Sequence, residues 1–247
     1  MDKTPYIEGI FNYCNRRCEL CAFTERCGLF RDLRAYEQRH PDRGPLEQVH
    51  DNFQECFRLL EQWCKREGID FEALQREAQS EEAEAQMKRA ESEVHGDPLQ
   101  KLATAYTLAA SKLVDGLSAA RTLRRWPPDV DAAVETIGWY AGMIGAKVHR
   151  ALHGFADRSE EPGDAVEDVV QNDWNGTAKV ARLIVGESKD AWRIVMQGGN
   201  APEDSPLKEL VDLLDRIDVA LEERFPRAMD FLRPGFDEPL SASVLNE

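Results

Sequence analysis

Four cysteines lie within a short stretch near the start of the chain, and thiolates are strong ligands for zinc and for iron–sulfur clusters. Gaps of three, two and five residues separate Cys14, Cys18, Cys21 and Cys27. Thiolates at such short spacings converge on one centre only where the backbone makes tight local turns. A chain of 247 residues can bury a substantial core without disulfide bonds, so the cysteines are not needed as staples. The segment therefore predicts a metal- or cluster-binding knot.

The second half of this segment is similar to a known cluster loop. Residues 17–27, Arg-Cys-Glu-Leu-Cys-Ala-Phe-Thr-Glu-Arg-Cys, resemble the iron–sulfur loop of the endonuclease-type and adenine-specific DNA glycosylases. Cys18, Cys21 and Cys27 match the last three ligands of that loop, and Cys14 does not, because the family leaves a longer gap before its second ligand. The resemblance implies a [4Fe-4S] cluster. It does not extend to the family's helix-hairpin-helix or catalytic aspartate region, so glycosylase activity is not implied.

The first half of the segment is similar to a different signature. Cys14-Asn-Arg-Arg-Cys18-Glu-Leu-Cys21 has the three- and two-residue gaps of the radical S-adenosylmethionine enzymes. In that family three thiolates leave one iron open for the cofactor, and a (β/α) barrel surrounds the cluster. This sequence lacks the periodicity of strands, and Cys27 is available for the fourth iron, so a closed four-thiolate cluster is the preferred interpretation.

One structural zinc ion in a closed tetrahedral site is the alternative centre. Zinc ligands usually form two pairs separated by a loop, whereas these four cysteines form one continuous run, as in a ferredoxin segment. We therefore favour a [4Fe-4S] cluster over zinc. Arg16, Arg17 and Arg26 either offset the negative charge of the thiolates and the cluster or simply face solvent.

A second group of candidate residues lies on a predicted helix over residues 129–154. Gly138, Gly142 and Gly145 fall along one side of it, which allows either close approach of another helix or a groove for a ligand. Glu135 and His149 lie seven residues before and after Gly142. If the glycines line a groove, these two side chains could act as acid–base groups or metal ligands.

Two histidines near the end of the same helix have the spacing of a chelating pair. His149 and His153 lie four residues apart, which places both rings on one helix face. Histidine is also favoured in the last turns of a helix by the helix dipole, without any metal. Both interpretations remain open from the sequence.

Apolar residues recur at helical spacing through most of the chain, and no stretch alternates with period two. The predicted helices cover residues 47–66, 71–94, 98 to about 126, 129–154, 173–197 and 206 onward. The predicted fold is all-α, a helical bundle of four or five long helices with an N-terminal four-cysteine metal knot. We assign residues 1–45 to the knot, 46–232 to the bundle and 233–247 to a tail. Cys56 and Cys64 are expected in the core.

Charge and hydropathy narrow the class of protein. The formal net charge is −15 and the isoelectric point is about 4.9, which disfavours binding to nucleic acid. Neither a signal peptide nor a membrane span is apparent, so we expect a cytoplasmic protein that does not bind membranes. Arginines concentrate in residues 16–43, and docking of this basic segment onto the chain's own acidic helices is the favoured explanation.

Three functions are compatible with these features. The leading hypothesis is a [4Fe-4S] protein in which the cluster has a redox, sensing or structural role. The first alternative is a zinc-stapled module that binds another protein through the bundle or the charged helix over residues 71–94. The second alternative is an enzyme with a groove near Gly142. The sequence does not indicate a substrate, a redox partner or an oligomeric state.

Overall fold

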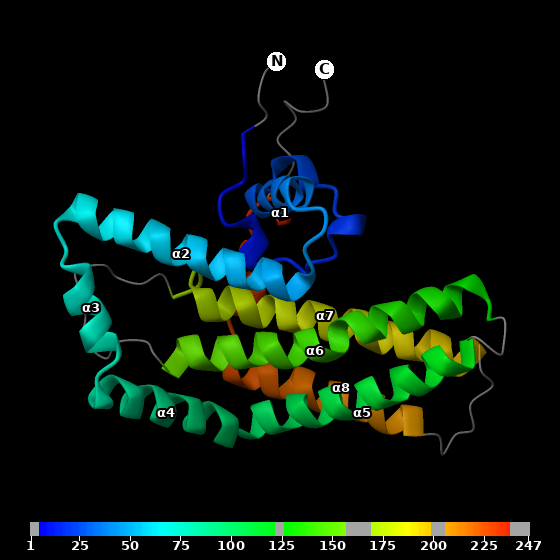
Figure 1. Ribbon diagram of the computed structural model, residues 1–247. Coiled ribbons are helices and arrows are strands. Elements are labelled where there is room, and N and C mark those ends of the chain that lie inside the picture. Colours follow the sequence, from blue (N-terminus) through cyan, green and yellow to red (C-terminus); the bar gives the residue numbers. More distant parts are fainter. Residues whose placement is uncertain (1–4, 122–125, 157–168, 199–205, 238–247) are drawn as a thin grey trace. The chain divides into compact units, whose positions relative to one another are not determined.

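The computed structural model describes residues 5–121, 126–156, 169–198 and 206–237, and within these ranges the chain is helical, without strands. The prediction of an all-α fold is therefore confirmed. The α-helices are α1 (Gly28–Arg39), α2 (Pro45–Glu67), α3 (Phe71–Ala78), α4 (Glu81–Gly96), α5 (Pro98–Arg121), α6 (Pro128–Ala156), α7 (Asp173–Gly198) and α8 (Pro206–Arg224) (Figure 1). Short 3-10 turns are η1 (Ile10–Asn12), η2 (Cys18–Leu20), η3 (Thr24–Arg26) and η4 (Ala228–Asp230).

Contacts divide the chain into two compact units, which we describe separately. Unit 1 comprises residues 1–11 and 18–89, and unit 2 comprises residues 12–17 and 90–247. The sequence analysis placed a boundary near residue 45 instead, with α2 in the bundle. In the structure α2 groups with the cysteine segment, because its neighbours in the fold are local in sequence, chiefly α3.

Unit 2 is a four-helix bundle with one hydrophobic core. Helix α6 packs between α5 and α7, and α8 packs against both α5 and α7, so the four helices form a closed ring (Figure 1). The predicted apolar stripes face this core. Their buried members include Leu99, Tyr106, Val134, Ile137, Ile144, Val148, Ala181, Val185, Trp192, Leu214, Ile217, Leu221 and Phe225. At the centre Trp192 Nε1 donates a hydrogen bond to Tyr106 Oη at 3.1 Å, which satisfies the indole donor without exposing it to water.

Residues Asn12–Arg17, here called the strap, belong to unit 2. In the sequence most of unit 1 lies between the strap and the helices of the bundle. Two side chains of α6 hold the backbone of the strap. Lys147 Nζ donates to the carbonyl of Asn12 at 3.0 Å, and Trp139 Nε1 donates to the carbonyl of Asn15 at 2.9 Å. The backbone on both sides of Cys14 is thereby fixed to the bundle.

Side chains of the strap add hydrogen bonds to the same helices. Asn15 Nδ2 donates to Tyr140 Oη at 2.8 Å, and Tyr140 in turn donates to the carboxylate of Glu187 on α7. Arg17 donates to Thr136 Oγ1 at 2.8 Å. Burial beside this carboxylate raises the pKa of Tyr140, so the phenol stays protonated and acts as a donor. Of the basic segment, Arg17 thus bonds to α6, and the docking of its other arginines onto the acidic helices stays a prediction.

The aromatic ring of Tyr13 is the apolar anchor of the strap. It packs on Phe231 with ring centroids 4.6 Å apart, and its hydroxyl donates to Asp173 Oδ1 at 3.1 Å. The space for the ring exists because Gly176 has no side chain. A Cβ atom there would lie 2.5 Å from the Tyr13 ring and 2.7 Å from Phe231.

A buried lysine fastens the segment after α8 to the bundle. Lys179 Nζ on α7 donates to the carbonyl of Phe231 at 2.7 Å and to that of Met229 at 3.2 Å, and it pairs with Asp237 at 2.7 Å. Arg233 donates to the same carboxylate. The hydrogen bonds from Arg233 and Lys179 lower the pKa of Asp237 despite the opposing effect of desolvation. The predicted tail thus has turn structure as far as Asp237, and its remainder lies outside the described residues.

Unit 1 buries very little apolar surface. Among its described side chains only Ile10 and Cys64 are buried. A polar contact joins α1 to α2, because Tyr36 Oη donates to Asp51 Oδ2 at 2.6 Å and Arg43 pairs with the same carboxylate. The prediction that both Cys56 and Cys64 lie in the core is right for Cys64 and wrong for Cys56, which is exposed beside the open space between α1 and α2.

We predict that Gly176→Ala will lower the free energy of unfolding of the full chain by about 1–3 kcal/mol, because the added methyl group overlaps the Tyr13 ring. Urea denaturation measures the effect. Gly186→Ala on the same helix is the matched control, since a Cβ there meets nothing within 4 Å and alanine is the better helix former. Equal stability of Gly176→Ala and the wild type would show that Tyr13 does not occupy this position.

Candidate functional site

Three of the four clustered cysteines lie in the tight turns that the sequence analysis required. Cys18 begins η2, and the amide of Cys21 donates to the carbonyl of Cys18 at 3.2 Å. Cys27 follows η3 and its amide donates to the carbonyl of Thr24 at 3.2 Å. The amide of Phe23 donates to Cys21 Sγ at 3.4 Å. An N–H···S hydrogen bond of this kind stabilises a thiolate and orients it as a ligand.

The fourth cysteine, Cys14, lies in the strap beside a cationic side chain. Lys147 is largely buried, and desolvation lowers its pKa to about 8, an effect that Arg150 reinforces and that Cys14 opposes. Two residues further along, Arg16 has a φ of 58°, the left-handed conformation that residues other than glycine rarely adopt. The backbone around Cys14 is therefore both strained and held by hydrogen bonds.

None of the six cysteines forms a disulfide bond, and the four clustered ones are partly exposed. Within the described ranges, no group of three or more His, Cys, Asp or Glu side chains is arranged to hold a metal ion. The turns at Cys18, Cys21 and Cys27 suit thiolate ligands, and the convergence of the four cysteines on one centre stays a prediction.

The arginines near the cysteines interact with protein groups. Arg17 binds Thr136, and Arg26 Nε donates to the carbonyl of Pro5 at 3.3 Å. The amide of Ile7 donates to the carbonyl of Arg26 at 3.0 Å, so Ile7 lies beside η3. The suggested role of Arg16, Arg17 and Arg26 in offsetting the charge of a cluster stays a prediction.

The glycine side of α6 serves mainly for close helix packing. A Cβ on Gly145 would lie 3.0 Å from Thr107 Oγ1 of α5, and one on Gly138 would lie 3.2 Å from Val114. The hydroxyl of Thr107 donates to the carbonyl of Ala141 at 2.7 Å across this contact. Gly142 is exposed and a Cβ there would meet nothing within 4 Å.

The proposed acid–base pair lies along one helix. Glu135 is exposed and His149 is partly buried, and their separation of 14 residues on α6 corresponds to about 21 Å along the helix axis. One small substrate therefore could not contact both side chains. An enzyme site near Gly142 stays a prediction.

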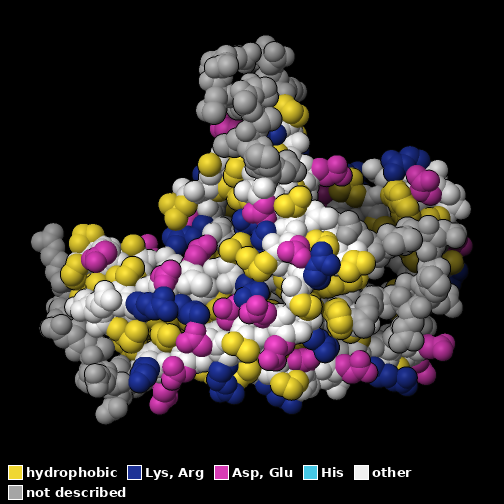
Figure 2. Space-filling model, turned by 180° about the vertical axis from the view of Figure 1, so that it is seen from behind, with side chains coloured by type: hydrophobic (Ala, Val, Ile, Leu, Met, Phe, Trp, Pro, Cys, Tyr) yellow, Lys and Arg dark blue, Asp and Glu magenta, His cyan; other side chains and the backbone are white. Residues whose placement is uncertain are grey.

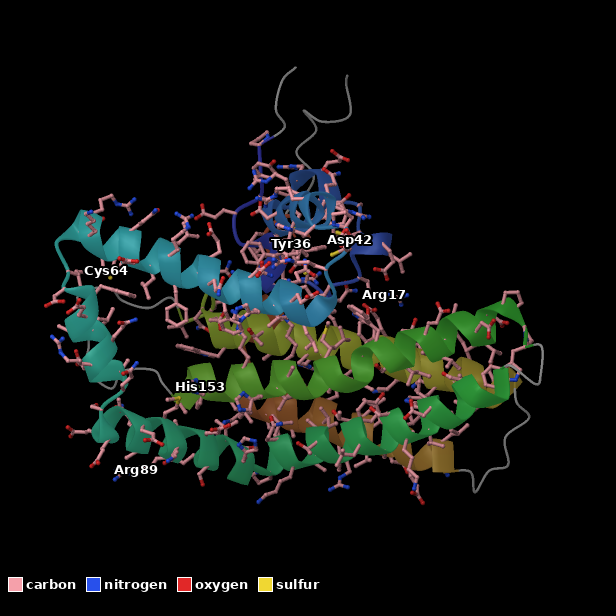
Figure 3. The ribbon with its side chains drawn as sticks, viewed as in Figure 1. Arg17, Tyr36, Asp42, Cys64, Arg89 and His153 are labelled. Carbon is pink, nitrogen blue, oxygen red and sulfur yellow. The ribbon has the colours of Figure 1, made fainter. Side chains whose placement is uncertain are left out.

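The histidine pair gains a third member that the sequence analysis did not connect with it. The ring of His95, in the last turn of α4, lies 5.6 Å from that of His149, and the ring of His153 lies 6.2 Å from His149 on the other side. His153 lies near the end of α6 (Figure 3). His95 Nδ1 is 2.8 Å from the carbonyl of Glu91. Because 54 residues separate His95 from His149, no local pattern could have joined them.

A groove between α1 and α2 of unit 1 was also not predicted. Its volume is about 640 Å³, and Tyr36, Asp51 and Glu55 contribute polar groups to it, with Leu33 and Leu59 among its apolar lining. The hydrogen bond from Tyr36 lowers the pKa of Asp51. The groove is a consequence of the polar α1–α2 contact, in which the helices meet without a packed core between them.

Several charged groups of unit 2 form ion pairs, including Arg182 with Asp218 at 2.9 Å and Lys189 with Asp215 at 2.6 Å. On the face shown in Figure 2, basic and acidic side chains are interspersed among hydrophobic ones. None of the helices in the described ranges is long and apolar enough to cross a membrane.

No protein-family model, curated protein or solved structure matches this chain. The similarity of the cysteine segment to iron–sulfur loops therefore stands on the residues quoted above. The function has to be argued from the cysteines, their turns and the packing of the unit that holds them.

We predict that the stability of the chain falls as pH is lowered below about 6.5, in part because of His149. Desolvation and the neighbouring His95 and His153 lower its pKa from 6.5 in the folded state, so the unfolded chain takes up the proton first. Above pH 6.5 the imidazole of His149 is neutral, so its burial does not lower the stability of the folded chain. Glu91 opposes this shift in part.

Urea denaturation between pH 7.5 and about 5 tests this effect. The loss of unfolding free energy should be smaller in His149→Gln than in the wild type. His50→Gln, which replaces an exposed histidine of α2, is the control and should keep the wild-type slope. An identical slope in all three proteins would contradict the prediction.

Proposed function

We propose that this chain binds a [4Fe-4S] cluster through Cys14, Cys18, Cys21 and Cys27, and that the cluster has a redox, sensing or structural role. The observation that carries the proposal is the lack of a core in unit 1, where only Ile10 and Cys64 are buried among the described side chains. A unit with so little buried apolar surface needs another source of stability, and metal ligation is one that small units commonly use, beside disulfide bonds and oligomerisation. Four cysteine thiols in a short stretch could supply the ligands.

Local geometry supports the same assignment. The 3-10 turns shorten the path between successive cysteines, and the amide of Phe23 already donates to Cys21 Sγ. A cluster with four thiolate ligands carries net negative charge, which the cations around Cys14, namely Lys147 and Arg16, would offset. The cluster supplies electron transfer or rigidity, and the chain supplies ligands, hydrogen bonds to sulfur and positive charge.

A zinc-stapled interaction module is the second candidate. It shares the four ligands, and the exposed apolar side chains of α2 favour it, because a helix that displays Phe53, Phe57 and Trp63 to water is typical of a binding surface. The metal distinguishes the two candidates. Zinc would make the unit purely structural, whereas a cluster would add a redox-active group.

Anaerobic purification followed by metal analysis and absorption spectroscopy tests the proposal. A [4Fe-4S] cluster should give about four irons per chain and a broad absorption band at about 400 nm that dithionite bleaches. A colourless protein with one zinc would support the second candidate. Absence of both metals after reconstitution with iron and sulfide, and after addition of zinc, would contradict both.

We predict that Cys21→Ser will lose most of the bound metal and will destabilise unit 1, because it removes a thiolate ligand and the acceptor of the Phe23 amide. Cys56→Ser is the matched control. Cys56 is an exposed free thiol outside the cluster segment, so this variant should keep the full metal content. Hydrogen exchange of α1–α3 in the two variants would report the loss of stability.

A further inference from the structure

Three of the five histidines of this chain meet within unit 2. His95 lies in the last turn of α4, and His149 and His153 lie one helical turn apart near the end of α6, where Figure 3 labels His153. The ring centre of His149 is 5.6 Å from that of His95 and 6.2 Å from that of His153. His149 and His153 are partly buried and His95 is exposed, so an ion in solution can reach the rings.

Buried neighbours in the sequence hold the backbone that carries these rings. Val94, directly before His95, is buried and belongs to the hydrophobic core of the bundle. Val148, directly before His149, is fully buried in the same core. The rings therefore meet because both helices are packed at this place, and their contact does not depend on loose surface side chains.

The hydrogen bond of His95 determines which of its ring nitrogens can bind an ion. Its Nδ1 atom lies 2.8 Å from the carbonyl oxygen of Glu91, and a carbonyl group can only accept a hydrogen bond. Nδ1 therefore carries the proton, and Nε2 of the neutral ring keeps its lone pair. Histidine ligands of metal ions are usually oriented in this way, by a hydrogen bond from the other ring nitrogen to a carbonyl or carboxylate group.

The spacing of the rings is close to that of two imidazoles on one metal ion. Bonds of about 2.0 Å from a tetrahedral zinc ion to two imidazole nitrogens place the ring centres about 5 Å apart. The two separations given above exceed this value by about 1 Å, so the described side chains do not yet surround a single point. A rotation of about 25° about χ1 moves a ring centre by about 1 Å, and side chains tolerate such a departure from a rotamer.

Electrostatics at this place favour a cation. Helix α4 ends at Gly96 and α6 ends at Ala156, so both helices present the negative ends of their dipoles near the rings. Glu91 lies one turn before His95, and its negative charge acts on His149. The helix dipole alone explains a histidine near each helix end, but it does not explain why rings from two helices meet, because protonated imidazoles repel one another.

We propose that zinc, or a divalent transition-metal ion with the same preference for imidazole, binds between α4 and α6 with His95, His149 and His153 as its ligands. Three imidazoles leave the fourth tetrahedral position to water. The ion would join the end of α4 to α6. This site shares no residue with the cysteine segment and does not rest on the function proposed for it.

Nuclear magnetic resonance of the full chain, with isotope-labelled histidine ring nitrogens, tests the proposal. About two zinc ions per chain are added at about pH 7.5, because the cysteine segment has thiolate ligands for an ion of its own. Ligation should strongly shift a ring nitrogen of His95, His149 and His153. His40 and His50 lie outside this group and are internal controls that should show no such shift.

A pair of matched variants measures the contribution of one ligand. His149→Gln should weaken zinc binding by about 10-fold or more, since even the loss of an outer-shell partner costs about 10- to 100-fold. His50→Gln replaces an exposed histidine of α2 and should keep the wild-type affinity. The affinity is taken from the zinc-dependent shift of the His95 ring, so zinc bound at the cysteines does not enter the measurement. Circular dichroism should show the same helicity in both variants.

Several outcomes would overturn the proposal. Zinc that leaves all three rings unchanged shows that they bind no ion, and similar shifts of all five histidines show adventitious binding to surface imidazoles. Shifts of His149 and His153 without His95 show a chelate of α6 alone. Equal affinity of His149→Gln and the wild type excludes this ring as a ligand. A cysteine segment that takes up no metal, with the three histidine shifts retained, contradicts the proposed function and leaves the histidine site standing.

Discussion

The closed ring of α5, α6, α7 and α8 around Trp192 and Tyr106 is the packing on which the rest of the described chain depends. Nearly all of the buried apolar surface lies there. Because burial of apolar surface is the dominant favourable term in folding, unit 2 has the means to fold by itself. Helices of this ring also hold the strap and the segment after α8 through hydrogen bonds, from Lys147 to Asn12 and from Lys179 to Phe231.

Unit 1, in contrast, buries very little apolar surface among its described residues. Its helices begin and end where local signals place them, as at Gly44 and Gly68, yet its described side chains supply almost no core. Helices in this situation gain stability mainly from tertiary contacts that lie outside themselves. Metal ligation by the clustered cysteines is the source of such contacts that we propose.

The sequence was sufficient for the elements that local patterns specify. The all-α class and the long helices follow from apolar periodicity, and the starts at Pro98 and Pro206 follow from the preference of proline for the first helical turn. One predicted helix over residues 71–94 is in fact two, α3 and α4. They are separated at Ser80, whose hydroxyl accepts the amide of Ala83 at 3.2 Å and so begins a new helix.

The sequence was insufficient for contacts between distant residues. Periodicity reports which side of a helix is apolar, but the role of Gly176 depends on Tyr13, and the setting of His149 depends on His95. The same limit applies to α2, whose apolar side reads as a core face although most of it, including Phe53 and Phe57, is exposed. Cysteine spacing likewise indicates a metal or cluster centre but does not establish that the four thiols converge on it.

The strap has a consequence for the kinetics of folding. Its hydrogen bonds join residues between 119 and 160 positions apart, from Arg17 to Thr136 and from Tyr13 to Asp173. Closing such long loops is entropically costly, so these bonds are expected to form after the bundle has collapsed, at the far side of the rate-limiting barrier. During synthesis the strap is made first and must wait for α6 and α7. Loss of one of its bonds would then accelerate unfolding and leave the refolding rate nearly unchanged.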